Sequence, residues 1–379
     1  MRRLPSLAAL SLALVLPGGA LAEVLSKPLR SAVPAKAGGT VVLENLAGTL
    51  VVVSGRGADA ILSGTAFADA GSPSESQRLL DALSLDVKDG GGRVTLHVTY
   101  PVDRSPFRYR GEKDGSSRWS RSSSTVDYQG RRVEVTEGGS SKPLLCAYLR
   151  LEVPEGVAVH VTNHLGRVEA RGVGADLEVK TASADVAADD VAGALKIRTG
   201  SGDVRVGGSA GLDLSTGSGD VVAERIRGAV RISTGSGDVE LARAEAEKVS
   251  VHTGSGDVAL DAVAGSLALQ TGSGDIRGRA RRGVERLDGG TGSGQVVLSL
   301  DAARFAGGDV EAASGDVDLA LSSAPALTLT VSTASGDIDA GGLPGVRVSK
   351  RTEHQLEAEV NGGGAALRIH TASGNVSVR

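Results

Sequence analysis

The stretch TGSGDVELARAEAEKVSVHTGSGDVAL, from Thr234 to Leu260, contains the phrase Thr-Gly-Ser-Gly-Asp-Val twice, nineteen residues apart. Further copies or variants of this phrase occur along most of the chain. They begin at Thr162, Thr181, Thr199, Thr216, Thr234, Thr253, Thr271, Thr291, Ala312, Thr333, Thr352 and Thr371. A nearly fixed spacing of 17 to 21 residues indicates a repeat protein, in which each copy is one structural unit.

The apolar residues of each repeat alternate with polar ones. Val239 ends the phrase that begins at Thr234, Leu241 follows it, and Val249 and Val251 precede the next phrase. Alternation with β-branched residues predicts two short strands per repeat. A unit this short has no room for a helical crossover, so we expect an all-β parallel β-solenoid, similar to a β-helix or β-roll. Its coils of about 18–19 residues would stack at ~4.8 Å.

The letters of the phrase have separate expected roles. Its fourth letter is Gly in nine of the ten well-matched copies, the exception being Ala184, which predicts a positive φ or a close backbone approach. Its fifth letter is usually Asp, and in a solenoid these carboxylates would line up and repel one another. We expect each to accept turn N–H groups; a row of bound cations and a face for a cationic partner are the alternatives. The candidate cation ligands are Asp203, Asp220, Asp238, Asp257 and Asp275.

Composition limits the class of protein. A single cysteine, Cys146, cannot form an internal disulfide, and a formal net charge of −4 gives no reason to expect nucleic-acid binding. The 54 glycines accompany 40% hydrophobic residues, which favours many tight turns between short strands over disorder.

The first 22 residues have the pattern of a signal peptide. Two arginines precede a short apolar run that ends in Ala20-Leu21-Ala22. No later apolar run reaches the ~20 residues that a transmembrane helix requires. We therefore expect an exported protein without a transmembrane segment, located in the periplasm, on the cell surface or outside the cell.

The region before the main repeats predicts a different organisation. Residues 23–66 read as N-terminal strands that include a first coil, because residues 39–55 have the same strand, Asn-turn, Gly, strand pattern as residues 159–170. Residues 67–150 read as a small α+β insertion. It would contain a helix capped by Ser72, a strand at residues 93–100 and a mobile basic loop over residues 101–141. The repeat solenoid would occupy residues 151–379.

Aromatic and arginine side chains alternate within this loop. Such residues commonly anchor protein partners or sugars, so the loop is a candidate contact surface. The alternative is a solvated loop with a small local core. The candidate contact residues are Phe107, Arg108, Tyr109, Arg110, Arg118, Trp119 and Arg121.

The sequence brings no catalytic group together. The segment Gly289–Gly294 lacks the Lys-Ser/Thr pair of a phosphate loop, and a serine that recurs in every well-matched repeat is a poor candidate for one activated nucleophile. We expect a protein that is not an enzyme and has no cofactor. Two alternatives stay open: a calcium-stabilised β-roll-like protein, whose coils also use Gly-Asp turns, and a polysaccharide lyase or hydrolase on a β-helix.

The Thr-Gly-Ser-Gly-Asp-Val turns, with the run Val153–Val157 before them, resemble those of an exported bacterial family of unknown function labelled "putative adhesin" with β-strand repeats. The resemblance covers about residues 39–379 and implies the repeat architecture, with no catalytic residues to transfer. We expect an adhesin-like binding protein or scaffold at the cell envelope, with an envelope protein or glycan as partner. The coil ending at Arg379 would leave a strand edge open to self-association.

Overall fold

The computed structural model describes residues 24–102, 107–109, 123–137, 142–323 and 325–379. The chain divides into two compact units. The first comprises the residues up to Glu169 together with Lys180–Ala184, and the second comprises Ala170–Val179 and Asp185–Arg379. The described part consists of strands and one helix, which confirms the all-β class.

The first ten strands and the helix precede Gly172. They are β1 (Leu25–Pro34), β2 (Thr40–Gly55), β3 (Asp59–Asp69), α1 (Pro73–Ala82), β4 (Ser84–Asp89), β5 (Arg93–Thr99), β6 (Phe107–Tyr109), β7 (Ser123–Tyr128), β8 (Arg131–Glu137), β9 (Leu144–Pro154) and β10 (Ala158–Arg171). Pairing among them is mixed. β2 is parallel to β5 and β9, whereas β3 is antiparallel to β1 and β9, and β4–β5 and β7–β8 are antiparallel pairs.

Helix α1 begins where the sequence predicts. The Ser72 hydroxyl accepts a hydrogen bond from the Glu75 amide at 3.3 Å, and Pro73 occupies the first turn. Leu79 and Leu80 form its buried side. At its C-terminal end the Lys27 ammonium of β1 donates to the carbonyls of Leu80 and Leu83, at 2.9 and 2.8 Å. A cation there satisfies carbonyls that the helix leaves unpaired.

The remaining strands carry the repeats. They are β11 (Leu177–Asp189), β12 (Val191–Ser201), β13 (Val204–Val206), β14 (Ser209–Ser218), β15 (Val221–Glu224), β16 (Val230–Ser236), β17 (Val239–Ala242), β18 (Glu245–Ser255), β19 (Val258–Ser273), β20 (Ile276–Ser293), β21 (Val296–Asp301), β22 (Gly308–Ser314), β23 (Val317–Ser322), β24 (Leu327–Ser335), β25 (Ile338–Asp339), β26 (Val346–Arg351), β27 (Gln355–Val360), β28 (Ala365–Ser373) and β29 (Val376–Val378).

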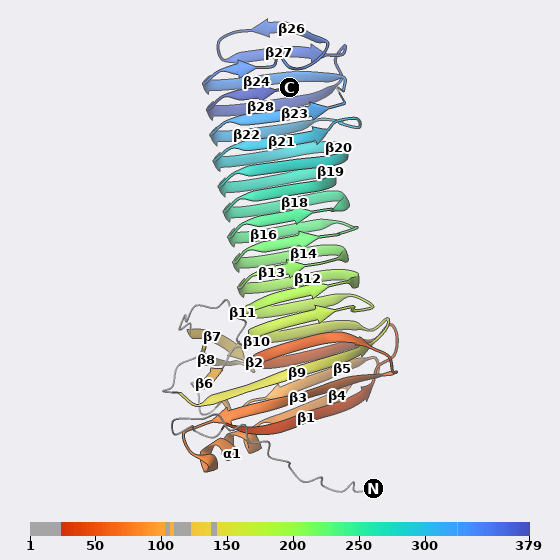
Figure 1. The fold of residues 1–379 in the computed structure, drawn as a ribbon, viewed down its shortest axis with the longest axis vertical. Helices are drawn as coiled ribbons and strands as arrows, with labels where there is room; N and C mark the ends of the chain where they lie inside the picture. Colours follow the sequence, from red (N-terminus) through yellow and green to blue (C-terminus); the bar gives the residue numbers. More distant parts are fainter. Residues whose placement is uncertain (1–23, 103–106, 110–122, 138–141, 324) are drawn as a thin grey trace, which may run out of the picture. The chain divides into compact units, whose positions relative to one another are not determined.

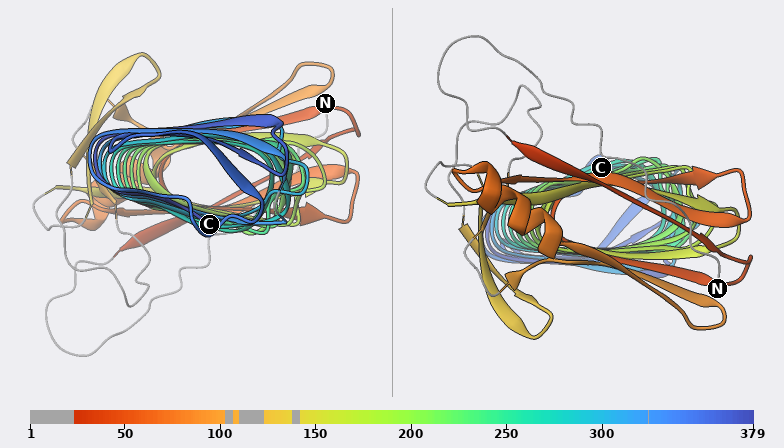
Figure 2. Two further views of the ribbon diagram at one scale, coloured as in Figure 1. Left: turned by 90° about the horizontal axis from the view of Figure 1, so that it is seen from above. Right: turned by 90° about the horizontal axis from the view of Figure 1, so that it is seen from below.

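Successive repeats of the second unit pair in parallel and in register. Val221 lies opposite Val239, which lies opposite Val258, and Thr216, Thr234 and Thr253 align in the same way. In Figure 1 these strands lie one above another, and in Figure 2 the repeats superpose when viewed along the stack. The first residue after each turn is at most 1% exposed at Val204, Val221, Val239, Val258, Ile276, Val296, Val317 and Val376. Burying each such side chain is worth about 1.5–3 kcal/mol.

The C-terminal end of this unit departs from the expected order. β28 pairs in parallel with β22 on one side and β24 on the other, and β29 lies between β23 and β25. The repeat ending at Arg379 is therefore interior, and the predicted open edge beside it is wrong. The edge instead belongs to the antiparallel hairpin β26–β27, which pairs with β24 through β27. This hairpin replaces the repeat expected at Thr352, so the sheet is mixed rather than wholly parallel.

The predicted mobile loop at residues 101–141 also needs correction. Its described residues include the strands β6, β7 and β8, which form a small sheet with Val126, Val133 and Val135 buried. The high polarity of the segment hides these short strands because their outward positions are charged. The positions 103–106, 110–122 and 138–141 lie outside the described residues.

Candidate functional site

The repeated turn is a hydrogen-bonded structure. From Asp203 to Gln295, the backbone N–H of the fifth-letter residue donates to the Oδ1 atom of the Asp one repeat earlier, as from Asp238 to Asp220 at 3.0 Å and from Asp257 to Asp238 at 2.8 Å. The same bond recurs at Asp203, Asp220, Asp275 and Gln295. Near the C-terminus the backbone N–H of Asn375 donates to Asp316 Oδ1, and that of Asp337 donates to the side-chain oxygen of Asn375. Acceptance of N–H groups by these aspartates is therefore confirmed, with the donor supplied by the neighbouring repeat.

The first-letter threonines complete the turn from within the core. The hydroxyl of Thr253 donates to the carbonyl of Gly237 at 3.2 Å, and that of Thr271 donates to Gly256 at 2.9 Å. Both threonines are buried. Thr199 and Thr216 instead donate to the Ser201 and Ser218 carbonyls of their own turns, and the buried hydroxyl of Thr234 has no hydrogen-bond partner. From Thr253 onward the turn thus joins neighbouring repeats through both a side-chain carboxylate and a side-chain hydroxyl.

The fourth-letter glycines satisfy both predicted conditions. Seven of the nine have φ between 126° and 156°. A Cβ atom at Gly237 would also lie 2.2 Å from the carbonyl oxygen of Gly219 in the preceding repeat. Only glycine fits a position that combines this conformation with this approach.

The five candidate cation ligands all lie in this ladder of turns. Within the described residues, no group of three or more His, Cys, Asp or Glu side chains is arranged to hold a metal ion. The Arg277 guanidinium contacts the Oδ2 atom of Asp275 and lies 3.8 Å from that of Asp257. The arginine supplies positive charge at this end of the ladder.

A second polar cluster lies in the first unit, where sequence reasoning did not find it. The Glu44 carboxylate of β2 lies between two imidazoles: His97 Nδ1 of β5 is 3.0 Å from Oε2, and His164 Nε2 of β10 is 3.1 Å from Oε1. The hydrogen bond from His164, followed by that from His97, lowers the pKa of Glu44 to about 2 against the opposing effect of burial. At neutral pH this carboxylate is ionised and accepts from both rings.

The tip of the β7–β8 hairpin lies against this cluster. Tyr128 stacks on the His97 ring at 5.6 Å, meets His164 edge-on at 5.7 Å, and donates its hydroxyl proton to the carbonyl of Val98. Gln129 and Gly130 form the turn with φ of 55° and 72°, and the Gln129 amide contacts His97 Nε2. Burial raises the pKa of the Tyr128 phenol. The hairpin is therefore anchored to β5 and β10 through one aromatic side chain.

Two buried asparagines lie beneath the cluster. Asn45 Nδ2 donates to Asn163 Oδ1 at 2.8 Å, Tyr100 donates to Asn45 Oδ1 at 2.8 Å, and Asn163 donates to the carbonyl of Gly48 at 2.9 Å. Both asparagines have no exposed surface. The shared pattern of residues 39–55 and 159–170 was the sequence signal for this alignment, and it could also have drawn attention to Glu44 and His164.

The predicted contact residues divide into two groups. Phe107 and Tyr109 are only 1% and 6% exposed, so they belong to the local core and not to a contact surface. Arg108 is bound to the Asp69 carboxylate at 2.8 Å and to the carbonyl of Lys142. These three positions follow the alternative interpretation, a small local core. Arg110, Arg118, Trp119 and Arg121 lie outside the described residues.

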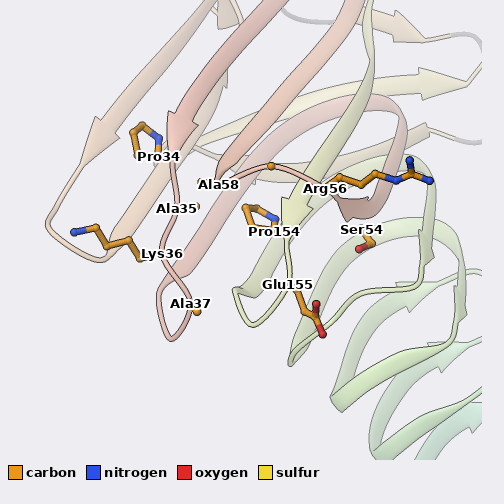
Figure 3. Close-up of a pocket in the computed structure, with 11 residues that line it drawn as sticks. Pro34, Ala35, Lys36, Ala37, Ser54, Arg56, Ala58, Pro154 and Glu155 are labelled. Carbon is orange, nitrogen blue, oxygen red and sulfur yellow. The ribbon is translucent and has the colours of Figure 1, made fainter.

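A shallow cavity of about 720 Å³ opens in the first unit. Its lining comes from the end of β1, the β2–β3 connection and the end of β9, and includes Lys36, Arg56 and Glu155 as charged residues. Figure 3 shows the Lys36 and Arg56 side chains extending in opposite directions. Because the two cations do not converge, this cavity has no focused charge.

Fold and site together define an all-β repeat protein whose recurring motif holds its repeats together. The sequence profile of the family described as Toastrack DUF4097 matches residues 127–311 and 306–379, which is more than half of the chain. The chain belongs to this family. No curated protein sequence matches it.

Three solved structures are similar in part. A "putative cell adhesion protein" from Clostridium sporogenes is 10% identical over 93% of this chain and 99% of its own, with a TM-score of 0.19. A "putative adhesin" from Bacteroides fragilis is 9% identical over 93% and 97%, with a TM-score of 0.22. Another from Parabacteroides merdae is 8% identical over 78% and 91%, with a TM-score of 0.21.

Among the described residues, no helix is long and apolar enough to cross a membrane.

Proposed function

We propose that the protein is exported and acts as a non-enzymatic β-solenoid scaffold or adhesin-like binding protein at the cell envelope. The observation that carries this proposal is that each repeat has two kinds of position: motif residues that bind the neighbouring repeat, and exposed residues that do not. The Thr, Gly and Asp of the motif bind the neighbouring repeat, as Thr253, Gly237 and Asp238 do. Side chains that are committed to the frame are poor candidates for substrate chemistry.

The outward positions, in contrast, vary from repeat to repeat. One aligned column reads Arg205, Val222, Glu240 and Ala259, and these side chains are exposed. A constant frame with a varied surface is the arrangement by which repeat proteins present a binding face. The N-terminal signal-peptide pattern supports the location at the envelope.

The test is binding of the full mature chain to a panel of envelope glycans and envelope proteins. Two surface variants are compared: Arg205→Ala with Glu240→Ala on one column, and His252→Ala with Gln270→Ala on another. All four side chains are exposed, so both variants should keep the melting temperature of the parent. We expect one variant to lose binding and the other to keep it.

Three results would contradict the proposal in different ways. Absence of binding by the parent would remove the binding role. Turnover of a polysaccharide by the purified chain would favour the alternative of a β-helix enzyme. A melting temperature that rises by many degrees in millimolar calcium, and no longer rises in Asp238→Asn, would favour the calcium-stabilised β-roll.

A further inference from the structure

The end module of the second unit, residues Leu327–Arg379, joins the stack through its last strands. β28 and β29 lie on β22 and β23, although β24 follows β23 in the chain. At this junction the backbone N–H of Asn375 donates to Asp316 Oδ1 at 2.7 Å, and the Thr371 hydroxyl donates to the carbonyl of Gly315 at 3.3 Å. Arg379 pairs with Asp318 at 2.9 Å. The junction repeats the bonds that join any two repeats.

The end module is paired within itself. β24 binds β27 and β28, β26 binds β27, and β25 binds β29. None of these pairings uses a strand before Leu327. The module can therefore leave and meet the stack as one body, through the β22–β28 and β23–β29 pairings alone.

The covalent connection to the module is short and must pass the layer of β28 and β29. It leaves β23 at Ser322 and enters β24 at Leu327. Ser323 has φ of 65°, a conformation that costs a residue with a Cβ atom free energy, and Pro325 restricts the chain further. Short, strained connections favour exchange of an element between two copies, because exchange relieves the strain without losing contacts.

The edge formed by β22 and β23 is complementary to the end of this chain. Asn375 supplies a neutral side chain between Asp316 and Asp337, where most repeats carry Asp. The backbone N–H of Asn375 donates to Asp316, and its side-chain oxygen accepts from Asp337, so Asn375 bonds in both directions as the aspartates of other repeats do. The edge formed by β22 and β23 therefore accepts β28 and β29, and a second copy of the chain presents the same two strands.

We propose that the end module of one chain docks on β22 and β23 of a second copy, giving a reciprocally exchanged dimer. This inference concerns contacts between copies and does not depend on the envelope ligand of the proposed function. Such an exchange would let two stacks meet through their ends.

The experiment uses cysteines at two exposed positions that are partners across the junction, Glu311 and His370. Adjacent strands bring Cα atoms within the range of a disulfide. Full-length chains carrying Glu311→Cys or His370→Cys, each with Cys146→Ala, are mixed, unfolded, refolded together and oxidised. We expect a covalent heterodimer on a non-reducing gel, in clear excess over the homodimers that each variant forms alone.

The double variant with both cysteines reports on the junction itself and should close within one chain at low concentration. If it closes while the mixture stays monomeric, the exchange is overturned. Homodimers as abundant as the heterodimer would also overturn it, because they indicate random collision. If the double variant does not close, the junction and the exchange both fail. A parent chain with four extra residues after Ser322 should exchange several-fold less, because the longer connection relieves strain in the monomer.

Discussion

At the scale of single residues, the motif holds three kinds of contact in six positions. The Gly approaches the preceding backbone, the Thr caps a carbonyl from inside, and the Asp accepts an amide from outside. The Gly and Asp contacts bridge two repeats, as does the Thr contact from Thr253 onward, so a change at one of these letters disturbs a junction and not one turn alone. The three letters can therefore be tested separately.

Replacing Gly237 by Ala is expected to destabilise the fold. The new Cβ atom would lie 2.2 Å from the carbonyl oxygen of Gly219, in a backbone with φ of 148°. We expect a loss of about 1–3 kcal/mol in the free energy of unfolding, measured by urea denaturation. Gly211→Ala is the control, because its nearest atom is 3.6 Å away; an equal loss there would contradict the close-approach argument.

Thr234 and Thr253 occupy the same letter and should respond oppositely to valine. Thr253→Val removes the hydroxyl that caps Gly237 and should cost about 1 kcal/mol. Thr234→Val removes a buried hydroxyl with no partner and should leave stability unchanged or raised. Thermal melting of the two variants side by side measures the difference. Equal losses would mean that the hydroxyl bond contributes nothing at this position.

Glu44 is expected to make the free energy of unfolding depend on pH in the acid range. Its pKa is about 2 when folded and near 4.5 when unfolded, so its stabilisation is complete above 4.5 and declines as the pH falls toward 2. At pH 6 Glu44→Gln should lose on the order of 3 kcal/mol, and its gap to the parent should narrow below pH 4.5. Denaturant unfolding at pH 6, 4 and 3 measures this gap. The exposed Glu240→Gln is the control, and a gap independent of pH would contradict the assignment.

At the scale of elements, sequence and structure agree where local chemistry decides. The cap and apolar side of α1 are visible in residues 72–83, and the alternation after each turn predicts the buried valines. The three strands β6 to β8 were missed because they are short and polar on their outer side. The β7–β8 hairpin is held in place through Tyr128, whose partners on β5 and β10 are distant in the sequence.

The start of α1 can be weakened without touching the core. Ser72→Ala removes the cap on the Glu75 amide and should lower stability by about 1 kcal/mol. Ser72→Asp should retain most of it, because aspartate also caps and suits the positive end of the helix. The two variants are compared by denaturant unfolding of the full chain. Equal losses in both would show that the cap bond has no role.

At the scale of the whole molecule, periodicity predicts the all-β class and the register of the main repeats. It does not predict the end module, because Thr352 continues the period while its neighbours form an antiparallel hairpin. It also does not predict that the last repeat in the sequence lies between two earlier ones, since pairing between distant strands leaves no periodic signal. The cluster at Glu44 escaped for the same reason, as its three residues lie on three separate strands.

The interior position of the last repeat makes it indispensable to the end of the second unit. Deleting Gly362–Arg379 removes β28 and β29, which in the described part of the chain join β24 and β25 to β22 and β23. We expect rapid proteolysis from β24 onward and a clearly lower melting temperature. Limited digestion and thermal scanning measure these two effects. Deletion of a whole interior repeat, Thr234–His252, is the control and should keep a protease-resistant fold. Equal resistance of both deletions would contradict the bridging role.

The equivalence of the interior junctions bears on how such a gene can change length. Each Asp offers the same oxygen to whichever amide follows, so Asp220 would receive Asp257 as readily as Asp238. Duplication or loss of one unit by unequal recombination would then leave no unmatched surface inside the series. Lineages could lengthen or shorten the molecule in single steps while the closing segment at its end stays the same.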